Sequence, residues 1–426
     1  MFSTFFQSNT EGLHIAMIKK PELLAPAGDF EKLQLAVTCG ANAVYIGGKQ
    51  FSLRANATNF DDDELRKAIA YAHDHGARVY VGVNIFAHNT DIHGVEKYLR
   101  SLKDMNVDAV IVADPGIFDI ARKIDGLEIH ISTQANVTNY QSALFYRDLG
   151  ASRVILAREL SFPEITEINE KIALSPSDNP FETEVFVHGA MCVAYSGRCL
   201  LSNFLTGRDG NKGDCAQPCR SNFHLHEERR PGEYIPIHED ERGTYLLNSK
   251  DLCMIEYIPE LIASGVSSFK IEGRMKSPHF VAAVVHAYRQ AIDDYFECAS
   301  LYESKKEHYI NEIKKTNYRE FFTGFFLGRP SDGQRYTDNV YSATNDFLGI
   351  VLSYDAERGL ALIEQRNKFS IGEEMDFLMG GFKQVITELY DEDGIPIESA
   401  PHPKQKVYMK VDKPLKKLEI MRYGRS

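Results

Sequence analysis

Short apolar and β-branched runs alternate with amphipathic stretches from Pro21 to about Asp294. The stretches between the runs, such as 30–40, 63–76 and 95–107, keep an apolar face at helical spacing and have the length of a crossover helix. This alternation predicts an α/β fold in which repeated βα units close into a TIM-like (β/α)8 barrel. The expected strands lie at Glu22 to Gly28, Ala43 to Gly48, Arg78 to Asn84, Ala109 to Asp114, Glu128 to Ala135, Arg153 to Glu159, Glu184 to Ala190 and Ser268 to Gly273.

The regular alternation stops between the seventh and eighth of these strands. Residues from about Met191 to Asn248 contain Gly, Asp, Asn, Pro and paired basic residues with little periodicity. An irregular insertion of this length in a compact domain usually carries function. In a barrel it would leave the carboxyl ends of the strands, where active sites are built.

A second change of pattern follows the barrel. A charged stretch at 304–322 has helical spacing and leads into a link rich in Gly, Pro and Asp. From about Ala343 the chain turns to short alternating strands with hairpin turns, which predict a small all-β, barrel-like domain. We therefore expect an N-terminal extension at 1–20, the barrel at 21–300 with a cysteine-rich insertion at about 191–248, a helical linker at 301–342 and the β domain at 343–426.

The composition is that of a globular protein, with 43% hydrophobic and 25% charged residues in a chain of 426. That length favours two domains. We see no apolar run near the roughly 20 residues that a membrane span needs. The first residues, MFSTFFQSNTEGLHIAM, lack the basic region and apolar core of an export signal. The sequence therefore predicts a soluble, cytoplasmic protein that has no membrane partner.

The net charge of −12 argues against a general nucleic-acid coat but allows a local RNA site. Such a site could use the basic residues near the C-terminus, although a solvated edge-strand face is an equal alternative. These residues are Lys404, Lys406, Lys410, Lys413, Lys416, Lys417, Arg422 and Arg425.

Four of the seven cysteines fall within 28 residues, with spacers of six, fifteen and three residues between them. Four thiolates on one irregular segment can converge on a single metal centre, and the small residues around them suit an iron–sulfur cluster. The spacings differ from the paired CxxC units of zinc ribbons, so zinc is the second choice. Buried cysteines without a metal are the remaining alternative. The four are Cys192, Cys199, Cys215 and Cys219.

The segment EVFVHGAMCVAYSGRCLLS, from Glu184 to Ser202, resembles the signature of the collagenase-like peptidase family at every fixed position. Further matches are PELLAPAG from Pro21, AVYIGG from Ala43, NSKDL from Asn248 and FKIEGRMKSPHF from Phe269. The resemblance therefore covers essentially the whole chain. With its C-terminal β domain and its CAQPC pair, the chain is most similar to the branch of the family that hydroxylates tRNA.

The resemblance implies a 4Fe-4S cluster on Cys192, Cys199, Cys215 and Cys219. Relatives in the ubiquinone branch recruit a later cysteine, and Cys253 is the alternative to Cys219 on that basis. The tRNA branch implies prephenate-dependent, oxygen-independent 5-hydroxylation of the wobble uridine, with the anticodon region of tRNA as partner and a small dicarboxylate, prephenate, as co-substrate. Other branches hydroxylate ribosomal RNA or ubiquinone precursors, and some members have been called collagenases.

Polar residues at or just beyond the carboxyl ends of the expected strands are candidates for a substrate pocket. For substrate binding we expect Arg54, Asn84, Gln134, Arg158 and Arg274, because arginine forks bind carboxylates bidentately. For catalysis we expect His188, Arg158, Lys270 and Glu272. Asp114 has the same placement. For each residue, a salt bridge at the barrel rim is the alternative.

A peptidase needs an activated nucleophile with a base, or a metal-bound water with an open coordination position. The sequence has no GxSxG elbow and no HExxH motif. His188 could act as base for a cysteine, or it could orient a cluster or cap a strand. A collagenase-like peptidase and a non-catalytic RNA-binding subunit, whose cluster only stabilises the insertion, remain the alternative functions.

Overall fold

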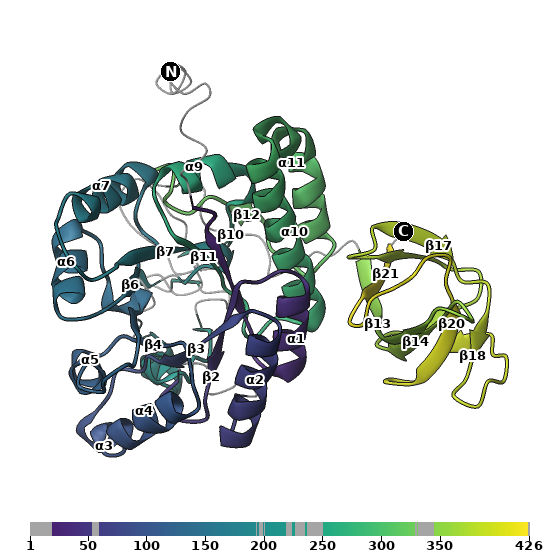
Figure 1. The fold of residues 1–426 in the computed structure, drawn as a ribbon, viewed down its shortest axis with the longest axis horizontal. Helices are drawn as coiled ribbons and strands as arrows, with labels where there is room; N and C mark the ends of the chain where they lie inside the picture. Colours follow the sequence, from purple (N-terminus) through teal and green to yellow (C-terminus); the bar gives the residue numbers. More distant parts are fainter. Residues whose placement is uncertain are drawn as a thin grey trace.

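The computed structural model describes residues 19–52, 59–192, 194–195, 199, 201–218, 224–225, 235–236, 250–328, 330 and 345–424. Figure 1 shows a barrel of strands ringed by helices, with a smaller β domain beside it. Within the described residues, no helix is long and apolar enough to cross a membrane.

The barrel is closed, as predicted. Strand β11 pairs in parallel with both β1 and β7, and the strands from β1 to β7 pair in sequence order. Their interior and outer faces are buried, which explains the near-continuous apolar runs. The strands are β1 (Glu22–Pro26), β2 (Ala43–Gly47), β3 (Arg78–Val83), β4 (Ala109–Val112), β5 (Ile129–Ile131), β6 (Arg153–Ile155), β7 (Glu182–Ala190) and β11 (Ser268–Ile271).

Helices pack on the outside of this barrel and begin at clear caps. Helix α2 (Asp62–Asp74) has a capping box formed by Asp61 and Glu64. Helix α4 (Val95–Asp104) turns its apolar stripe toward the sheet. The others are α1 (Phe30–Thr38), α3 (Asn89–Ile92), α5 (Pro115–Ala121), α6 (Tyr140–Asp148), α7 (Phe162–Ala173), α9 (Ile258–Ala263) and α10 (Pro278–Glu297), with short 3-10 turns η2 (Thr133–Ala135) and η6 (Ile255–Tyr257).

Two short strands extend the barrel sheet beyond β7 and were not expected from the sequence. Strand β10 (Asp251–Cys253) pairs antiparallel to β7, and β12 (Phe321–Phe322) pairs with β10. Between β7 and β10 the described parts of the insertion include α8 (Leu201–Thr206), η4 (Gly210–Lys212), β8 (His224–Leu225) and β9 (Ile235–Pro236).

The C-terminal domain is an antiparallel sheet in the order β17-β16-β21-β13-β14-β20-β18, with β15 and β19 paired separately. This matches the predicted all-β domain. Helix α11 (Ala299–Lys314) lies in the predicted linker and packs on α10. The strands are β13 (Asn345–Asp355), β14 (Leu360–Gln365), β15 (Phe369–Ser370), β16 (Glu374–Phe377), β17 (Phe382–Val385), β18 (Leu389–Tyr390), β19 (Ser399–Ala400), β20 (Lys406–Lys410) and β21 (Ile420–Gly424).

Charged and aromatic contacts join the two domains. The guanidinium of Arg422, on β21, donates to Glu312 of α11 at 3.0 Å and to Asp376 at 2.8 Å. Arg366 pairs with Glu31 of α1. The side chain of Arg422 is 1% exposed, so these charges are buried together between the domains.

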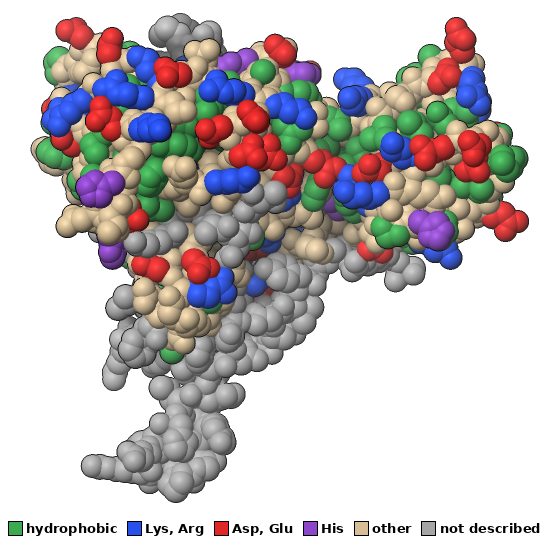
Figure 2. Space-filling model, turned by 90° about the horizontal axis from the view of Figure 1, so that it is seen from below, with side chains coloured by type: hydrophobic (Ala, Val, Ile, Leu, Met, Phe, Trp, Pro, Cys, Tyr) green, Lys and Arg blue, Asp and Glu red, His purple; other side chains and the backbone are tan. Residues whose placement is uncertain are grey.

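The predicted basic patch near the C-terminus is therefore incomplete. Arg422 points into the domain interface. The Lys410 ammonium donates a hydrogen bond to the carbonyl of Arg358 at 2.7 Å. Arg425 lies outside the described residues. On the face drawn in Figure 2, basic and acidic side chains are interspersed over both domains.

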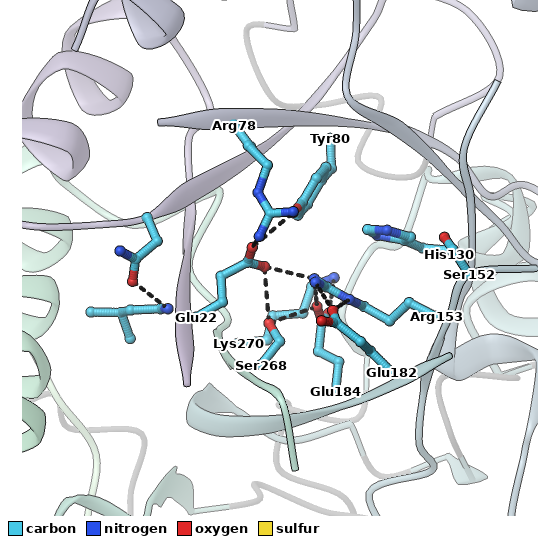
Figure 3. A network of polar contacts seen from close by, with 12 residues as sticks. Glu22, Arg78, Tyr80, His130, Ser152, Arg153, Glu182, Glu184, Ser268 and Lys270 are labelled. Carbon is cyan, nitrogen blue, oxygen red and sulfur yellow. Dashed lines mark hydrogen bonds and ion pairs between the residues drawn. The ribbon is translucent and has the colours of Figure 1, made fainter. Parts of the chain in front are cut away.

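The amino end of the barrel interior holds a buried network of charges (Figure 3). Arg153, at the start of β6, donates to Glu22 at 2.6 Å and to Glu184 at 3.1 Å. Glu22 also accepts from Tyr80 at 2.8 Å and pairs with Arg78. Burial alone would raise the pKa of Glu184, but the cations Lys270 and Arg153 lower it below its ordinary value. The network closes this end of the barrel with paired charges.

Candidate functional site

A cavity of about 150 Å³ opens at the carboxyl ends of the barrel strands. Parallel strands end at the same edge, so their terminal residues meet there. The cavity brings together three of the predicted cysteine ligands and six of the predicted pocket residues. It is lined by Tyr45, Gly82, Asn84, Ile111, Ser132, Thr133, Gln134, Ile155, Arg158, Phe186, Cys192, Cys199, Gly210, Cys215, Lys270, Glu272 and Arg274.

The cysteines stand on a local framework of backbone hydrogen bonds. The Gln217 amide donates to the sulfur of Cys215 at 3.4 Å. The side chain of Asn211 accepts from the Cys199 amide at 3.2 Å and donates to the Cys199 carbonyl at 2.9 Å. The Asn211 carbonyl in turn accepts from the Phe86 amide, just beyond β3. The insertion is thereby fixed to the barrel rim.

These features suit a thiolate-bound cluster in part. Amide donors to cysteine sulfur are typical around iron–sulfur clusters, and Cys192, Cys199 and Cys215 face one cavity. Among the described residues, however, no three His, Cys, Asp or Glu side chains are close enough to hold a metal ion. The fourth predicted ligand, Cys219, lies outside the described residues. The cluster therefore stays a prediction.

Two cations of the cavity lie over one aromatic ring. The guanidinium carbon of Arg158 is 3.9 Å from the centre of the Phe186 ring, and the Lys270 nitrogen is 5.4 Å from it. Lys270 is also 4.6 Å from the centre of the Tyr45 ring and donates to Glu184 at 3.0 Å. Cation–π contacts of this kind strengthen when they are desolvated, and Lys270 is only 4% exposed.

The remaining polar residues of the cavity hold one another. The side-chain amide of Asn84 donates to the carbonyl of Gln134 at 3.0 Å. Glu272 accepts from the Tyr45 hydroxyl at 3.3 Å. Arg274 donates to Ser52 at 3.2 Å and to Asn59 at 2.5 Å.

Arg274 explains a glycine at the end of β2. A Cβ at Gly47 would lie 2.1 Å from the Arg274 guanidinium, so only glycine leaves room for it. Arg274 thus braces the loop after β2, next to the segment 53–58 that includes Arg54. Arg54 itself lies outside the described residues.

Models of two protein families match the chain in succession. The model of peptidase family U32 matches residues 28–335, and the model of the peptidase family U32 C-terminal domain matches residues 343–422. The chain belongs to peptidase family U32. This confirms the expected membership, and both halves of the U32 architecture are present.

Relatives in the U32 family include proteins named for RNA modification. The chain is 42% identical over 412 residues to tRNA hydroxylation protein P1 of Bacillus subtilis, which covers 96% of each chain. It is 33% identical over 442 residues to tRNA hydroxylation protein P of Escherichia coli, which covers 93% of this chain and 95% of that one. It is 34% identical to the 23S rRNA 5-hydroxycytidine C2501 synthase of Escherichia coli, over 72% of this chain and 45% of that one.

The U32 signature segment has a physical explanation in this structure. Glu184 holds Lys270, and Phe186 underlies both cations. Gly189 has φ +108 and would clash with the Glu272 carbonyl if it carried a Cβ, which it would place 2.2 Å away. The Ser202 hydroxyl donates to the Arg208 carbonyl at 2.7 Å and accepts from the Ala216 amide at 2.9 Å, next to Cys215. The signature therefore builds one wall of the cavity.

His188 does not line the cavity, although it belongs to the same U32 segment. It is 1% exposed and packs against the rings of Phe280, Tyr288 and Phe321. Neither ring nitrogen has a hydrogen-bond partner among the described residues. Burial lowers the pKa of His188 to about 3. The geometry gives no support to its predicted role as a catalytic base.

Two other candidates, Asp114 and Cys253, do not line the cavity. Asp114 caps α5 by accepting from the Gly116 amide at 2.7 Å, and it does not line the cavity. Cys253 lies on β10 opposite His188, and burial raises its thiol pKa to about 12. A buried thiol of that kind is a weaker ligand candidate than the three cysteines that face the cavity.

Eight cavity residues were not predicted, and four of them have polar or aromatic side chains, namely Tyr45, Ser132, Thr133 and Phe186. Tyr45 and Phe186 lie inside strands, and their signal was strand alternation toward the barrel interior. Ser132 and Thr133 fall within an expected strand end, which in the structure leads into the short turn η2. The signal for Ser132 and Thr133 was a polar pair in an otherwise apolar strand end.

Proposed function

We propose that this chain hydroxylates tRNA, making 5-hydroxyuridine at the wobble position with prephenate as co-substrate and without molecular oxygen. A 4Fe-4S cluster would be held by Cys192, Cys199, Cys215 and Cys219. The observation that carries the proposal is the shared cavity, in which three of these cysteines face the strand-end cations. The names of the Bacillus subtilis and Escherichia coli relatives support a tRNA substrate.

The cavity suits a single base better than a duplex. Its volume is about 150 Å³, so an RNA base must leave its stack to enter it. Bases in single-stranded loops are splayed out and read through their edges by hydrogen-bonding groups. Asn84 and Gln134 place paired side-chain amides on the cavity wall. An anticodon loop presents such bases, and the β domain would help to seat the arm that carries it.

Replacing the C5 hydrogen of uridine by a hydroxyl is a two-electron oxidation, so the donor must supply an oxygen atom and accept two electrons. When bound, an iron–sulfur cluster supplies electron-transfer or Lewis-acid chemistry. The residues of this chain bind and orient the two substrates. Arg158 and Lys270 offer positive charge to the donor, and Glu272 lies beside them as an acid or base.

The decisive experiment is deletion of the gene in its host, followed by mass spectrometry of tRNA nucleosides. We expect 5-hydroxyuridine and its derivatives to disappear and to return with the wild-type gene. A Cys215→Ser gene should not restore them. Unchanged wobble hydroxylation, in a strain without a paralogue, would remove the assignment.

The same strains separate the alternatives. Loss of a ribosomal RNA hydroxylation, or of a ubiquinone precursor, with intact tRNA would identify another hydroxylase substrate. Proteolysis by iron-free protein would identify a peptidase. Normal tRNA binding with modification that does not depend on the cavity residues would identify an RNA-binding subunit. Anaerobically purified protein should be brown, with absorbance near roughly 400 nm.

A further inference from the structure

Arg158 and Lys270 lie beside the Phe186 ring, and the contacts of Arg158 leave its positive charge uncompensated within the described residues. Arg158 donates to the Ala190 carbonyl at 3.3 Å, and its Nε atom has no hydrogen-bond partner among the described residues. Within the same residues it forms no ion pair. A carbonyl neutralises no charge, so the guanidinium retains its own.

Lys270 shares its carboxylate with another cation. Glu184 accepts from Lys270 through one oxygen and from Arg153 through the other, at 3.0 Å and 3.1 Å. Arg153 also has Glu22 and Glu182, so it does not depend on Glu184 alone. Lys270 is the cation of this network that also lines the cavity.

The geometry restricts where these cations can reach. Glu184 is 0% exposed and holds the Lys270 ammonium from the side of the amino end of the barrel. The guanidinium carbon of Arg158 lies 3.9 Å from the centre of the Phe186 ring, which limits where the guanidinium can move. Contacts that hold both cations beside the cavity reduce the entropy that binding would cost.

We propose that Arg158 and Lys270 form the anion-binding pair of the cavity and take a carboxylate group of a small organic acid beside the cysteines. Phe186 and Glu184 are positioning residues for this pair. The inference rests on the proposed function for the choice of acid, which is the donor. It differs from the expectation for Arg274, which is engaged by Ser52 and Asn59 as a brace, and it leaves the expectation for Arg54, outside the described residues, as a prediction.

The test is calorimetric titration of the full, anaerobically purified chain with prephenate. We expect Arg158→Met and Lys270→Met each to weaken binding about 10- to 100-fold, as expected for the loss of a charge-assisted contact. Lys270→Arg keeps the charge and should weaken binding less than Lys270→Met. Arg274→Lys should change the affinity less than about threefold while lowering the thermal midpoint. Lys123→Met, which removes the same charge from an exposed side chain, is the matched control.

Glu184→Gln gives a readout that a purely structural role would not move. Glu184 would act on the ligand through Lys270, so Glu184→Gln should weaken prephenate binding in the wild-type background and leave it unchanged in a Lys270→Met background. An equal loss of affinity in both backgrounds would overturn the positioning role of Glu184.

Affinities within twofold of wild type for folded Arg158→Met and Lys270→Met would overturn the anion site. So would wild-type protein that binds prephenate no better than a neutral amide. Equal affinity for inorganic phosphate would overturn the assignment to an organic acid. If the deletion strain keeps its wobble hydroxylation while the binding pattern holds, the proposed function fails and the anion site stands.

Discussion

The two ends of the barrel contain similar residue types but use them differently. At the amino end, Arg153 has carboxylate partners in Glu22, Glu182 and Glu184. At the carboxyl end, Arg158 has a carbonyl and an aromatic ring. A buried charge that is fully paired stabilises one structure, whereas an incompletely paired charge in a cavity is available to a ligand. The contrast separates residues that hold the barrel from residues whose charge is available to a ligand.

The largest expected effect comes from replacing the cysteines at the carboxyl end of the barrel. We expect Cys199→Ser and Cys215→Ser to lower bound iron and wobble hydroxylation by more than about tenfold, because each removes a predicted ligand. Cys253→Ser should keep both, because its thiol is buried and does not face the cavity. Iron content and tRNA mass spectrometry measure the two effects. Iron loss in Cys253→Ser, with iron retained in Cys219→Ser, would show that Cys253 and not Cys219 is the fourth ligand.

Substitutions in the charge network at the amino end of the barrel should change the stability of the fold. Arg153→Met leaves Glu22 and Glu184 buried with less positive charge, so the free energy of unfolding should fall by about 3–5 kcal/mol. Urea unfolding measures this change. Arg122→Met, at an exposed pair on the barrel surface, is the control and should cost less than about 1 kcal/mol. A loss for Arg153→Met as small as that of the control would show that the network is dispensable.

His188 gives a pH test of the wall behind the cavity. Its pKa is about 3 in the folded chain, below the ordinary 6.5, so the unfolded chain takes up a proton that the native chain does not. Stability should therefore fall as the pH drops from 6.5 toward 3, and His188 should account for about 2 kcal/mol of this loss at pH 5. His188→Phe should flatten unfolding profiles measured between pH 7 and 4. Parallel profiles for the variant and the wild type would contradict this account.

The smallest expected effect lies at the rim of the closed end. Arg78 pairs with Glu22, but its side chain is 48% exposed, so solvent screens the pair. Arg78→Met should lower the free energy of unfolding by less than about 1 kcal/mol. Raising the salt concentration should shrink this difference further. A salt-independent loss of unfolding free energy as large as that of Arg153→Met would show that Arg78 belongs to the buried network.

Strand positions in the barrel were predictable because burial on both faces leaves a direct signal in the sequence. All eight expected strands are present. Some expected strands extend beyond the observed ones, because polar residues there leave the sheet, as at Ser132. Strands β10 and β12 were not predictable, because they are three and two residues long and depend on pairing with β7 and with each other. Tertiary contacts decide such segments.

The site was predictable to the same degree. Strand-end placement found Asn84, Gln134, Arg158, Lys270, Glu272 and Arg274, because parallel strands end at one edge. His188 does not line the cavity, because the register between β7 and β11 shifts after Phe186, which pairs with Lys270, while His188 pairs with the next residue, Ile271. The extra residue breaks the alternation and directs His188 away from the cavity.

Arg422 has a consequence for any attempt to divide the chain. Its guanidinium is shared between Asp376 of its own domain and Glu312 of α11. Cutting the link between the domains would leave Glu312 facing water without that partner and would expose apolar surface around it. The shared guanidinium therefore keeps the β domain at a set spacing from the barrel, so the two domains should unfold together rather than as separate units.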